Sequence, residues 1–353
     1  MTAAILSAAS APAADAAGGR LGAHRMGRLA AMVTVGYHAS HEQLSPGALL
    51  RCVQRAEEAG FRAATCSDHF APWSERQAHS GFAWAWLGAA LQATSLPFGV
   101  VTAPGQRYHP AILAQAMATL AEMFPGRFWA ALGSGEAINE HITGDPWPEK
   151  AVRDERWVEC AGVIQRLLGG QEVTSDGYVR VDRAILWSRP PSPPPVLAAA
   201  VSEATARRAG AWADGLITIH QPPDVLRRVI AAFRDGGGDD KPVHVQVHLS
   251  WDDDEDKALA VAFDQWRTNV FGSDLAWNLE LPRQFDAAAE FVRPQDVHRS
   301  VLVSADLGRH VGWIEEVAGL DVEGIYLHHV GQEQDAFIDA FGERVLPRLV
   351  DPV

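Results

Sequence analysis

Cysteine and long apolar segments are both scarce in this sequence. Its 353 residues include three cysteines, Cys52, Cys66 and Cys160, whose spacing fits neither a disulfide framework nor a metal site. So few cysteines are typical of a reducing compartment, which predicts a cytoplasmic protein. No run of residues is apolar over the length of a membrane-spanning helix, so a helical membrane protein is not expected.

Positive charge is scarce as well. The formal net charge is −14, and a surface of that sign repels nucleic acid and anionic membranes. We therefore expect neither as a partner, and expect a small-molecule ligand instead. The hydrophobic fraction of 47% is that of a globular protein. The chain is long enough for two ordinary domains or for one large barrel with insertions.

Residues 1–31 are rich in alanine and low in complexity. Their apolar stretches are interrupted by Ser, Pro, Asp and Gly, and no apolar signal-peptide segment precedes a cleavage site. We expect residues 1–31 to be a disordered tail, or the product of translation upstream of a start at Met32. Residues 32–353 are expected to form a single domain.

Strands and helices alternate from Val33 onward. The predicted apolar strands are residues 33–37, 63–66, 97–101, 128–132, 196–201, 215–219, 243–249 and 324–328. Apolar strands separated by helices predict a parallel sheet buried on both faces, and eight such units predict a closed (β/α)8 TIM barrel, an α/β fold. An open doubly wound sheet is the alternative, but no Gly-rich dinucleotide turn follows the first strand. The predicted insertions are a hairpin at 172–181 and extra helices within 263–297.

One stretch, residues 66–73, contains polar residues that are unsuited to a hydrophobic core. The second predicted strand ends on Asp68 and His69, and an indole follows at Trp73. Asp and His are rarely buried together unless each has a partner. Ligands of α/β proteins bind at the carboxyl ends of strands. The sequence therefore predicts a functional site at the end of this strand.

Other polar side chains fall at the ends of the neighbouring strands. They are His38, the turn Gly133–Ser134–Gly135–Glu136, Asn139, Glu140, Ser202, His220, His248 and His328. In a barrel they share the catalytic face. His248 and His328 have the alternative of a hydrogen-bonded core role, and the turn has that of a plain strand-to-helix connection. A carboxylate at Glu136 and an imidazole at His69 across one cavity suit acid–base chemistry.

Five segments resemble the bacterial luciferase-like (LLM class) superfamily. They are Gly-Tyr-His-Ala-Ser (36–40), Ser-Asp-His-Phe-Ala-Pro-Trp (67–73), Arg-Tyr-His-Pro-Ala (107–111), Gly-Ser-Gly-Glu-Ala-Ile-Asn-Glu (133–140) and Ala-Asp-Gly-Leu-Ile (213–217). The similarity runs from about Val33 to Leu349. It is closest to the branch of deazaflavin-dependent glucose-6-phosphate dehydrogenases and to its subfamily presumed to use ordinary flavin. The resemblance implies a (β/α)8 barrel that holds an isoalloxazine-type ring at its C-terminal face.

The resemblance also implies catalytic roles for His69, Glu136, Asp68 and Trp73. His69 is expected to exchange a proton with the substrate hydroxyl as hydride leaves the adjacent carbon. Asp68 is expected to contact the ring or to orient His69, and Glu136 to handle the proton at the N1 side of the ring. Trp73 is expected to form a wall of the substrate pocket.

The cofactor contacts that the resemblance implies are Asp68, Val100, Val101, Ala103, Ser134, Gly135, Asn139, Val201 and Ser202. A non-proline cis peptide is expected at Val100–Val101. Two positions depart from the dehydrogenases: Val201–Ser202 replaces a Gly-Gly pair, and Ala103 replaces a threonine. The dipole and free N–H groups of the helix that starts at Glu203 favour an anion near Ser202.

The cations that bind the sugar phosphate in these dehydrogenases are mostly absent. One aligns with Arg299, but a lysine aligns with Pro222 and a neighbouring threonine with Ile219, and residues 273–278 contain no lysine. Without those charges a phosphate dianion is poorly held, so glucose 6-phosphate is not the expected substrate. Trp73, Ile219 and Trp277 predict a more apolar pocket.

We therefore expect an oxidoreductase, a dehydrogenase or monooxygenase, acting on a small, fairly apolar hydroxyl or carbonyl compound. FMN is the favoured cofactor, because Val201 prevents the close backbone approach of the glycine pair and Ala103 lacks the threonine hydroxyl. The polyglutamate tail of coenzyme F420, the alternative, would also need a cationic track, and the chain is strongly acidic overall. Other interpretations are a metal-dependent barrel hydrolase that uses the strand-end histidines, although no metal-ligand spacing is present, and a non-catalytic flavin carrier. A homodimer is expected by analogy.

Overall fold

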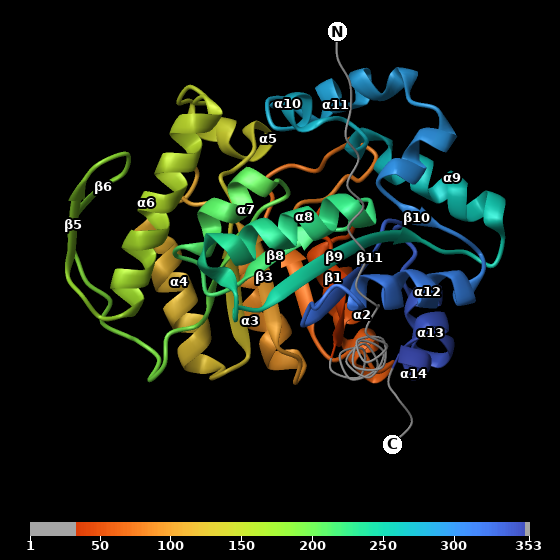
Figure 1. Cartoon of the computed structure of the whole chain (residues 1–353), viewed down its shortest axis with the longest axis horizontal. Helices are drawn as coiled ribbons and strands as arrows, with labels where there is room; N and C mark the ends of the chain where they lie inside the picture. Colours follow the sequence, from red (N-terminus) through yellow and green to blue (C-terminus); the bar gives the residue numbers. More distant parts are fainter. Residues whose placement is uncertain (1–32, 350–353) are drawn as a thin grey trace, which may run out of the picture.

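The structure, a computed structural model, describes residues 33–349. They form a closed barrel of parallel strands surrounded by helices (Figure 1). The barrel strands are β1 (Thr34–Ala39), β2 (Ala64–Ser67), β3 (Phe98–Thr102), β4 (Phe128–Leu132), β7 (Val196–Ala199), β8 (Leu216–Ile219), β9 (Val243–Ser250) and β11 (Gly324–His329). The predicted (β/α)8 TIM barrel is confirmed.

The strands follow one another around the barrel in chain order. β1 pairs with β2, β2 with β3, β3 with β4, β4 with β7, β7 with β8 and β8 with β9. β11 pairs with both β9 and β1, which closes the ring. All these pairings are parallel, so the carboxyl ends of the barrel strands lie at one end of the molecule.

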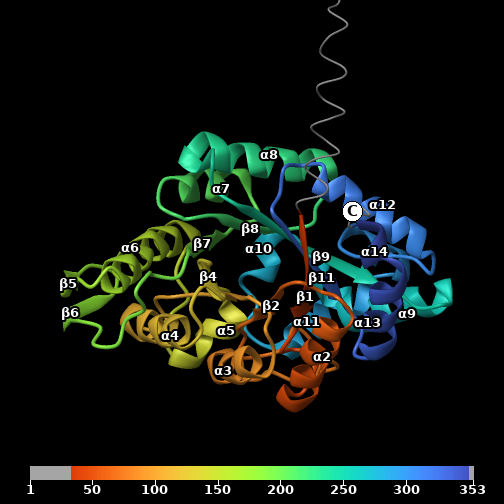
Figure 2. The ribbon, with the colours of Figure 1, turned by 90° about the horizontal axis from the view of Figure 1, so that it is seen from below.

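Helices cover the outside of the barrel (Figure 2). They are α2 (Pro46–Glu58), α3 (Ala83–Ala93), α4 (Pro110–Met123), α6 (Lys150–Leu168), α7 (Glu203–Gly210), α8 (Pro223–Phe233) with its continuation η2 (Arg234–Gly238), α12 (Leu307–Ala318), α13 (Asp335–Arg344) and α14 (Leu346–Leu349). In α2, Leu49, Val53 and Ala56 recur at helical spacing and are fully buried. Within residues 33–349 no helix has the length and apolarity to cross a membrane.

The strands are buried on both faces, which explains their near-continuous apolar sequences. Val100 of β3 lies in the core between strands and helices, whereas Val101 packs against Ala131 in the barrel interior. Gly99, also on β3, makes room for a large neighbour there. A Cβ atom at this position would lie 2.1 Å from Trp129 Cζ2, so the indole inside the barrel requires glycine.

Two insertions interrupt the barrel, as predicted. The first is the antiparallel hairpin of β5 (Val173–Asp176) and β6 (Arg180–Ala184), which projects beside α6 (Figure 1). The second separates β9 from α12. It contains α9 (Glu255–Trp266), η3 (Arg267–Asn269), α10 (Ser273–Ala276), α11 (Pro282–Ala288), η4 (Ala289–Phe291), η5 (Pro294–Arg299) and β10 (Leu302–Val303). β10, which pairs with the end of β9, was not predicted because two residues carry no strand pattern.

One backbone prediction is wrong. In the part of the chain that the structure describes, every peptide bond is trans, including Val100–Val101. Val100 pairs with Cys66 of β2 and with Ala130 of β4, and Val101 continues both ladders. Regular pairing on two sides keeps this backbone extended, whereas a non-proline cis bond costs about 2.5–4 kcal/mol. The predicted disordered tail, residues 1–31, lies outside the described residues.

Candidate active site

Three titratable side chains meet at the carboxyl end of the barrel. Glu42 follows β1, His69 follows β2, and Glu136 follows β4. His69 lies between the two carboxylates. Its Nδ1 is 3.1 Å from Glu42 Oε1, and its Nε2 is 3.7 Å from Glu136 Oε2. The predicted pairing of His69 with Glu136 is therefore present, and Glu42 is an additional partner.

Glu42 is a buried carboxylate with its own support. Its Oε2 accepts hydrogen bonds from Ser40 Oγ at 2.6 Å and from Ser67 Oγ at 2.8 Å. Burial by itself would raise its pKa, but the nearby His69 and these two hydroxyl donors hold the pKa of Glu42 below its ordinary value. Glu42 therefore stands as an anion beside Nδ1 of His69. The two atoms are at ion-pair distance without an aligned hydrogen bond.

Glu136 lies at the start of α5 (Ala137–Glu140), which runs into η1 (His141–Thr143). It occupies the N-cap position, but its side chain makes no capping hydrogen bond. Instead its Oε2 accepts a hydrogen bond from Asn139 Nδ2 at 3.2 Å and faces His69. Burial raises the pKa of Glu136 above its ordinary value. The carboxyl thus retains a proton at higher pH than a solvated glutamate, which suits an acid.

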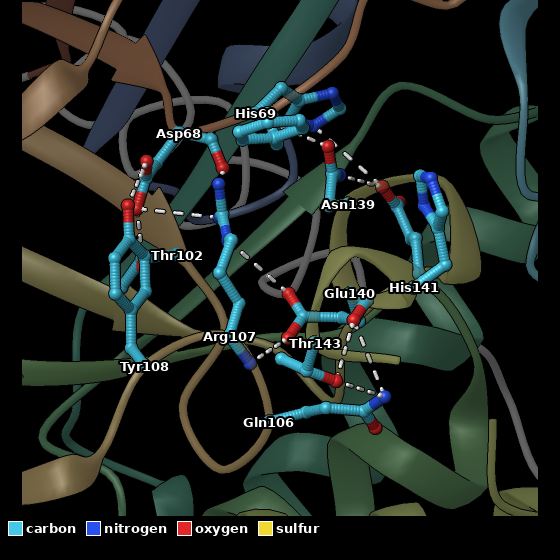
Figure 3. Close-up of polar contacts among 12 residues, drawn as sticks. Asp68, His69, Thr102, Gln106, Arg107, Tyr108, Asn139, Glu140, His141 and Thr143 are labelled. Atoms are coloured by element: carbon cyan, nitrogen blue, oxygen red, sulfur yellow. Dashed lines mark hydrogen bonds and ion pairs between the residues drawn. The ribbon is translucent and has the colours of Figure 1, made fainter. Parts of the chain in front are cut away.

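Asp68 turns away from this group, into the protein (Figure 3). Its Oδ2 accepts hydrogen bonds from Trp84 Nε1 at 3.1 Å and Thr102 Oγ1 at 2.7 Å, and its Oδ1 accepts one from Tyr108 OH at 3.1 Å. These donors leave the carboxylate little capacity for a ligand. Of the two predicted roles for Asp68, contact with a bound ring is not favoured by this geometry, and orientation of His69, the next residue in the chain, stays a prediction.

Arg107 joins this carboxylate to α5. Its Nη2 donates to the main-chain oxygen of Asp68 at 2.8 Å and lies 3.7 Å from Asp68 Oδ2. Its Nε lies 3.6 Å from Glu140 Oε1, and its main-chain N–H donates to Glu140 Oε2 at 2.6 Å. Figure 3 shows the guanidinium between the two acidic side chains. One buried cation therefore links the loops that follow β2, β3 and β4, and these loops carry His69 and Glu136.

Trp73, for which a pocket-wall role is predicted, stands beside His69. The two rings are 5.0 Å apart in an edge-to-face arrangement. Trp277 reaches the same region from the second insertion, because its main-chain oxygen accepts a hydrogen bond from Ala137 N at 3.1 Å. Ile219 ends β8 half-buried at the same end of the barrel. Arg299 is different: its side chain is 73% exposed and pairs with Asp296 at 3.4 Å, and no contact among the described residues joins it to His69.

The predicted cofactor residues divide into two groups. Val101, Ala103, Ser134, Gly135, Val201 and Ser202 are half-buried or exposed at the ends of β3, β4 and β7. They can therefore face a ligand. Val100 cannot present its side chain, because it is fully buried between strands and helices. Asn139 is buried and accepts a hydrogen bond from Phe70 N at 2.9 Å, so it braces the loop that carries His69.

The strand-end histidines form a separate group inside the barrel. Gln246 Nε2 lies 3.1 Å from both His248 Nε2 and His328 Nδ1, and His328 Nε2 lies 2.7 Å from Gln43 Oε1. His38 lies against His328, with ring centroids 4.5 Å apart. These contacts agree with the core role considered for His248 and His328. Within residues 33–349 no set of three His, Cys, Asp or Glu side chains has the arrangement of a metal site, so the hydrolase alternative gains no support.

Sequence reasoning missed Glu42 and Arg107. Glu42 lies three residues after the first strand, so its position relative to His69 depends on how the loop folds. The sequence did contain a signal for Arg107, because it is a lone arginine in a predicted active-site loop. A buried arginine requires counter-charges, and Asp68 and Glu140 at neighbouring strand ends could supply them. Its partners, however, are 39 and 33 residues away along the chain.

Comparison with known proteins agrees with this geometry. The sequence profile of the family described as luciferase-like monooxygenase matches residues 28–324. An F420-dependent glucose-6-phosphate dehydrogenase of Nakamurella multipartita is 34% identical over 330 residues, which cover 90% of this chain and 96% of the relative. An F420-dependent hydroxymycolic acid dehydrogenase of Mycobacterium tuberculosis is 36% identical over 324 residues, which cover 89% of this chain and 88% of the relative.

A solved structure is also similar over nearly its whole length. It is an F420-dependent secondary alcohol dehydrogenase in complex with an F420-acetone adduct, with a TM-score of 0.84 and 31% identity. The match covers 91% of this chain and 99% of that protein. The family profile spans residues 28–324, which include Glu42, His69, Arg107 and Glu136. The chain belongs to the luciferase-like monooxygenase family.

Proposed function

We propose that this protein is a coenzyme F420-dependent oxidoreductase that interconverts a small, fairly apolar alcohol and its carbonyl compound. The observation that carries the proposal is the placement of His69 between Glu42 and Glu136 at the catalytic end of the barrel. An imidazole that has a carboxylate anion on one side and a carboxyl of raised pKa on the other suits coupled proton and hydride transfer.

The protein's share of the reaction is the movement of protons. In the oxidation direction, the carbon–hydrogen bond of the alcohol breaks and its electron pair leaves as hydride, while the hydroxyl proton passes to Nε2 of His69. The Glu42 anion stabilises the imidazolium that results. Glu136, whose pKa burial raises above its ordinary value, is the group proposed to exchange a proton on the opposite side. The coenzyme, when bound, supplies the hydride acceptor.

The residues at the strand ends fit a flat heteroaromatic ring. Val101 and Ala103 offer small apolar surfaces, and the Ser134–Gly135 turn offers main-chain polar groups. Gly135 has a φ of +86°, and a Cβ added there would lie 3.2 Å from Trp147 and 3.3 Å from Glu140. The turn therefore keeps its close approach to the loop below only with glycine. The main-chain N–H groups at the start of α7 are available to an anionic tail, while the Ser202 hydroxyl caps the helix.

The preference for FMN that the sequence suggested is not supported by the similar relatives, whose names specify F420. The structural argument against F420 is also weak. Ser202 uses its hydroxyl to cap α7, where it accepts a hydrogen bond from Thr205 N at 3.4 Å. Binding of a cofactor phosphate here therefore depends on the main-chain N–H groups around Ser202, which are present without the glycine pair. The resemblance implies that His69, Trp73 and Glu136 keep the sequence pattern that the dehydrogenases use with the deazaflavin. We therefore propose F420 and treat FMN as the competing cofactor.

The substrate is proposed to be uncharged. Trp73 supplies apolar surface beside His69, Trp277 contacts Ala137 through its main chain, and Ile219 ends β8 at the same end of the barrel, while Arg299 is exposed and already paired with Asp296. A phosphate group would find no free cation among these residues. A small secondary alcohol fits this lining better than glucose 6-phosphate, and the acetone adduct in the name of the similar solved structure points the same way.

The test is a titration of the purified protein with F420 and with FMN, followed by turnover with 2-propanol. We expect F420 to bind at least tenfold tighter than FMN, and its absorbance to fall when 2-propanol is added. His69→Ala is the control, because it should bind F420 as the wild type does and leave its absorbance unchanged with alcohol. Tighter binding of FMN, or no bleaching with any of a panel of alcohols, would overturn the proposal. A cytoplasmic homodimer remains a prediction.

A further inference from the structure

Trp73 owes its position to an aromatic contact on each side. On one side its ring lies 5.0 Å from the His69 ring, and on the other it lies 5.4 Å from Phe285, again edge to face. Phe285 belongs to α11 of the second insertion and is completely buried. The indole that borders the substrate position is therefore positioned by a helix outside the barrel proper.

The loop that carries Trp73, residues 70–77, is tied to the same helix by one carboxylate. Asp286 Oδ1 accepts hydrogen bonds from Ser74 Oγ at 2.7 Å and from Arg76 Nη2 at 2.8 Å. Its Oδ2 accepts one from Glu75 N at 2.9 Å. Three successive residues of the loop thus donate to a single side chain of α11. Hydrogen bonds to a charged acceptor are the strong ones.

A second tie holds the loop from its inner side. Gln77, which is completely buried, accepts a hydrogen bond from Trp73 N at 2.9 Å and donates one to Gln265 O of α9 at 3.1 Å. Both ties therefore come from the insertion between β9 and α12. They differ in one respect: the Gln77 tie is inside the protein, whereas Asp286 lies at its edge.

Space for movement exists outside the Asp286 tie. A cavity of about 460 Å³ is lined by Glu75, Arg76 and Asp286 together with residues of α9, η3, α11 and η4. No protein atoms fill this volume, so the loop can move outward if its bonds to Asp286 are lost. If residues 74–76 lose their bonds to Asp286, the segment that carries Trp73 can shift relative to His69.

We propose that Asp286 is a positioning residue that holds the Trp73 loop closed and thereby limits the size of the substrate. The proposal rests on the proposed alcohol dehydrogenase function. Asp286 touches neither substrate nor cofactor and acts through Trp73. Its loss opens the pocket wall, so bulky secondary alcohols gain access while small ones lose their contact with the indole.

The first test needs no activity. Trypsin cleaves after arginine, and Arg76 is tied to Asp286 in the closed loop. In Asp286→Ala we expect cleavage after Arg76, identified by mass, at least fivefold faster than in the wild type. The matched control is Asp264→Asn, because Asp264 Oδ1 lies 3.6 Å from Arg76 Nε but makes no contact with Ser74 or Glu75. Equal cleavage rates in Asp286→Ala and wild type would overturn the proposal.

The second test uses the enzyme loaded with F420. The ratio of kcat/KM for 2-propanol to that for a bulkier secondary alcohol should fall at least fivefold in Asp286→Ala, mainly through KM, and stay unchanged in Asp264→Asn. Ser74→Ala, which removes one donor to Asp286, should show the same effect in smaller measure if Asp286→Ala does not fold. If the loop of Asp286→Ala is cleaved faster but the ratio of kcat/KM values stays constant, Asp286 has no role in selecting the size of the substrate. Absence of any turnover in the wild type contradicts the proposed function. A loop that resists trypsin in Asp286→Ala as it does in the wild type contradicts the claim that Asp286 holds the loop closed.

Discussion

His69 Nδ1 lies 3.1 Å from Glu42 Oε1, although the two residues follow different strands and the whole of α2 lies between them in the sequence. Ser40 and Ser67 fix the other oxygen of the same carboxylate. The pair therefore combines an imidazole open to the substrate side with an anion buried behind it. The buried carboxylate lies where positive charge would develop on the imidazole if it took a proton from an alcohol.

Glu42→Gln should lower turnover by about 10²-fold or more, within the range of roughly 10²–10⁴ for general acid–base catalysis. The amide keeps the size of the side chain but cannot stabilise a positive imidazole. The measurement is kcat in the proposed F420-dependent alcohol oxidation, and cofactor affinity, which should change little, is the control. In a His69→Ala background the same substitution should cost nothing further, because both residues act on one proton. Additive losses would show that Glu42 acts elsewhere.

Glu136→Gln should lower turnover and remove the alkaline limb of the pH–rate profile. Burial raises the pKa of Glu136, so the carboxyl keeps its proton at higher pH than a free glutamate and loses it as pH rises. If the protonated form is the active one, activity falls on that side only in the wild type. The profile of kcat against pH for both proteins checks this. Survival of both limbs in the variant contradicts the role of Glu136.

Arg107→Met should destabilise the protein by about 3–5 kcal/mol, the usual cost of leaving buried carboxylates without their cation. It should also lower kcat, because the loops that carry His69 and Glu136 lose their common link. Arg107→Lys should restore part of the stability but little of kcat, since an ammonium cannot reproduce the fork. Urea unfolding and steady-state kinetics measure the two effects.

Arg127→Met is the matched control for that variant. Arg127 donates to the main-chain oxygens of Leu91, Thr94 and Leu96, at the opposite end of the barrel. Its loss should reduce stability and leave kcat of the remaining folded enzyme unchanged. An equal fall of kcat in Arg127→Met would mean that Arg107 has only a general structural role.

Stability should fall as pH decreases from about 6.5 towards about 4. Burial lowers the pKa of His38 to about 4 and that of His248 to about 3, and it lowers the pKa of His328 as well. The unfolded chain binds protons at these histidines below about pH 6.5, whereas the folded barrel does not. Each such histidine then reduces the free energy of unfolding by about 1.4 kcal/mol per pH unit.

His248→Asn provides the check on this pH dependence. The slope of unfolding free energy against pH, measured with urea between about pH 6.5 and about pH 4, should decrease by about 1.4 kcal/mol per pH unit. The variant will be less stable at neutral pH because Gln246 loses a partner. An unchanged slope would show that His248 is protonated in the folded protein across this range.

Local sequence patterns determined the barrel and the positions of His69 and Glu136 within the site. The spacing of Leu49, Val53 and Ala56 and the apolar runs such as residues 128–132 specify helices and strands by periodicity alone. Because parallel strands all end on one face, the positions of His69 and Glu136 could be predicted without a structure. Local signals of this kind need no knowledge of distant residues.

Only the tertiary structure decided which side chains meet. Glu42 contacts His69 although α2 separates them in the chain, and Asp286 contacts Ser74 although 212 positions separate them. The trans backbone at Val100 follows from strand pairing on both sides. Arg299 aligned with a substrate cation but lies exposed beside Asp296. Hydrogen bonds and ion pairs depend on atoms a few ångströms apart. Loop folding sets those distances, and no periodic pattern in the sequence records them.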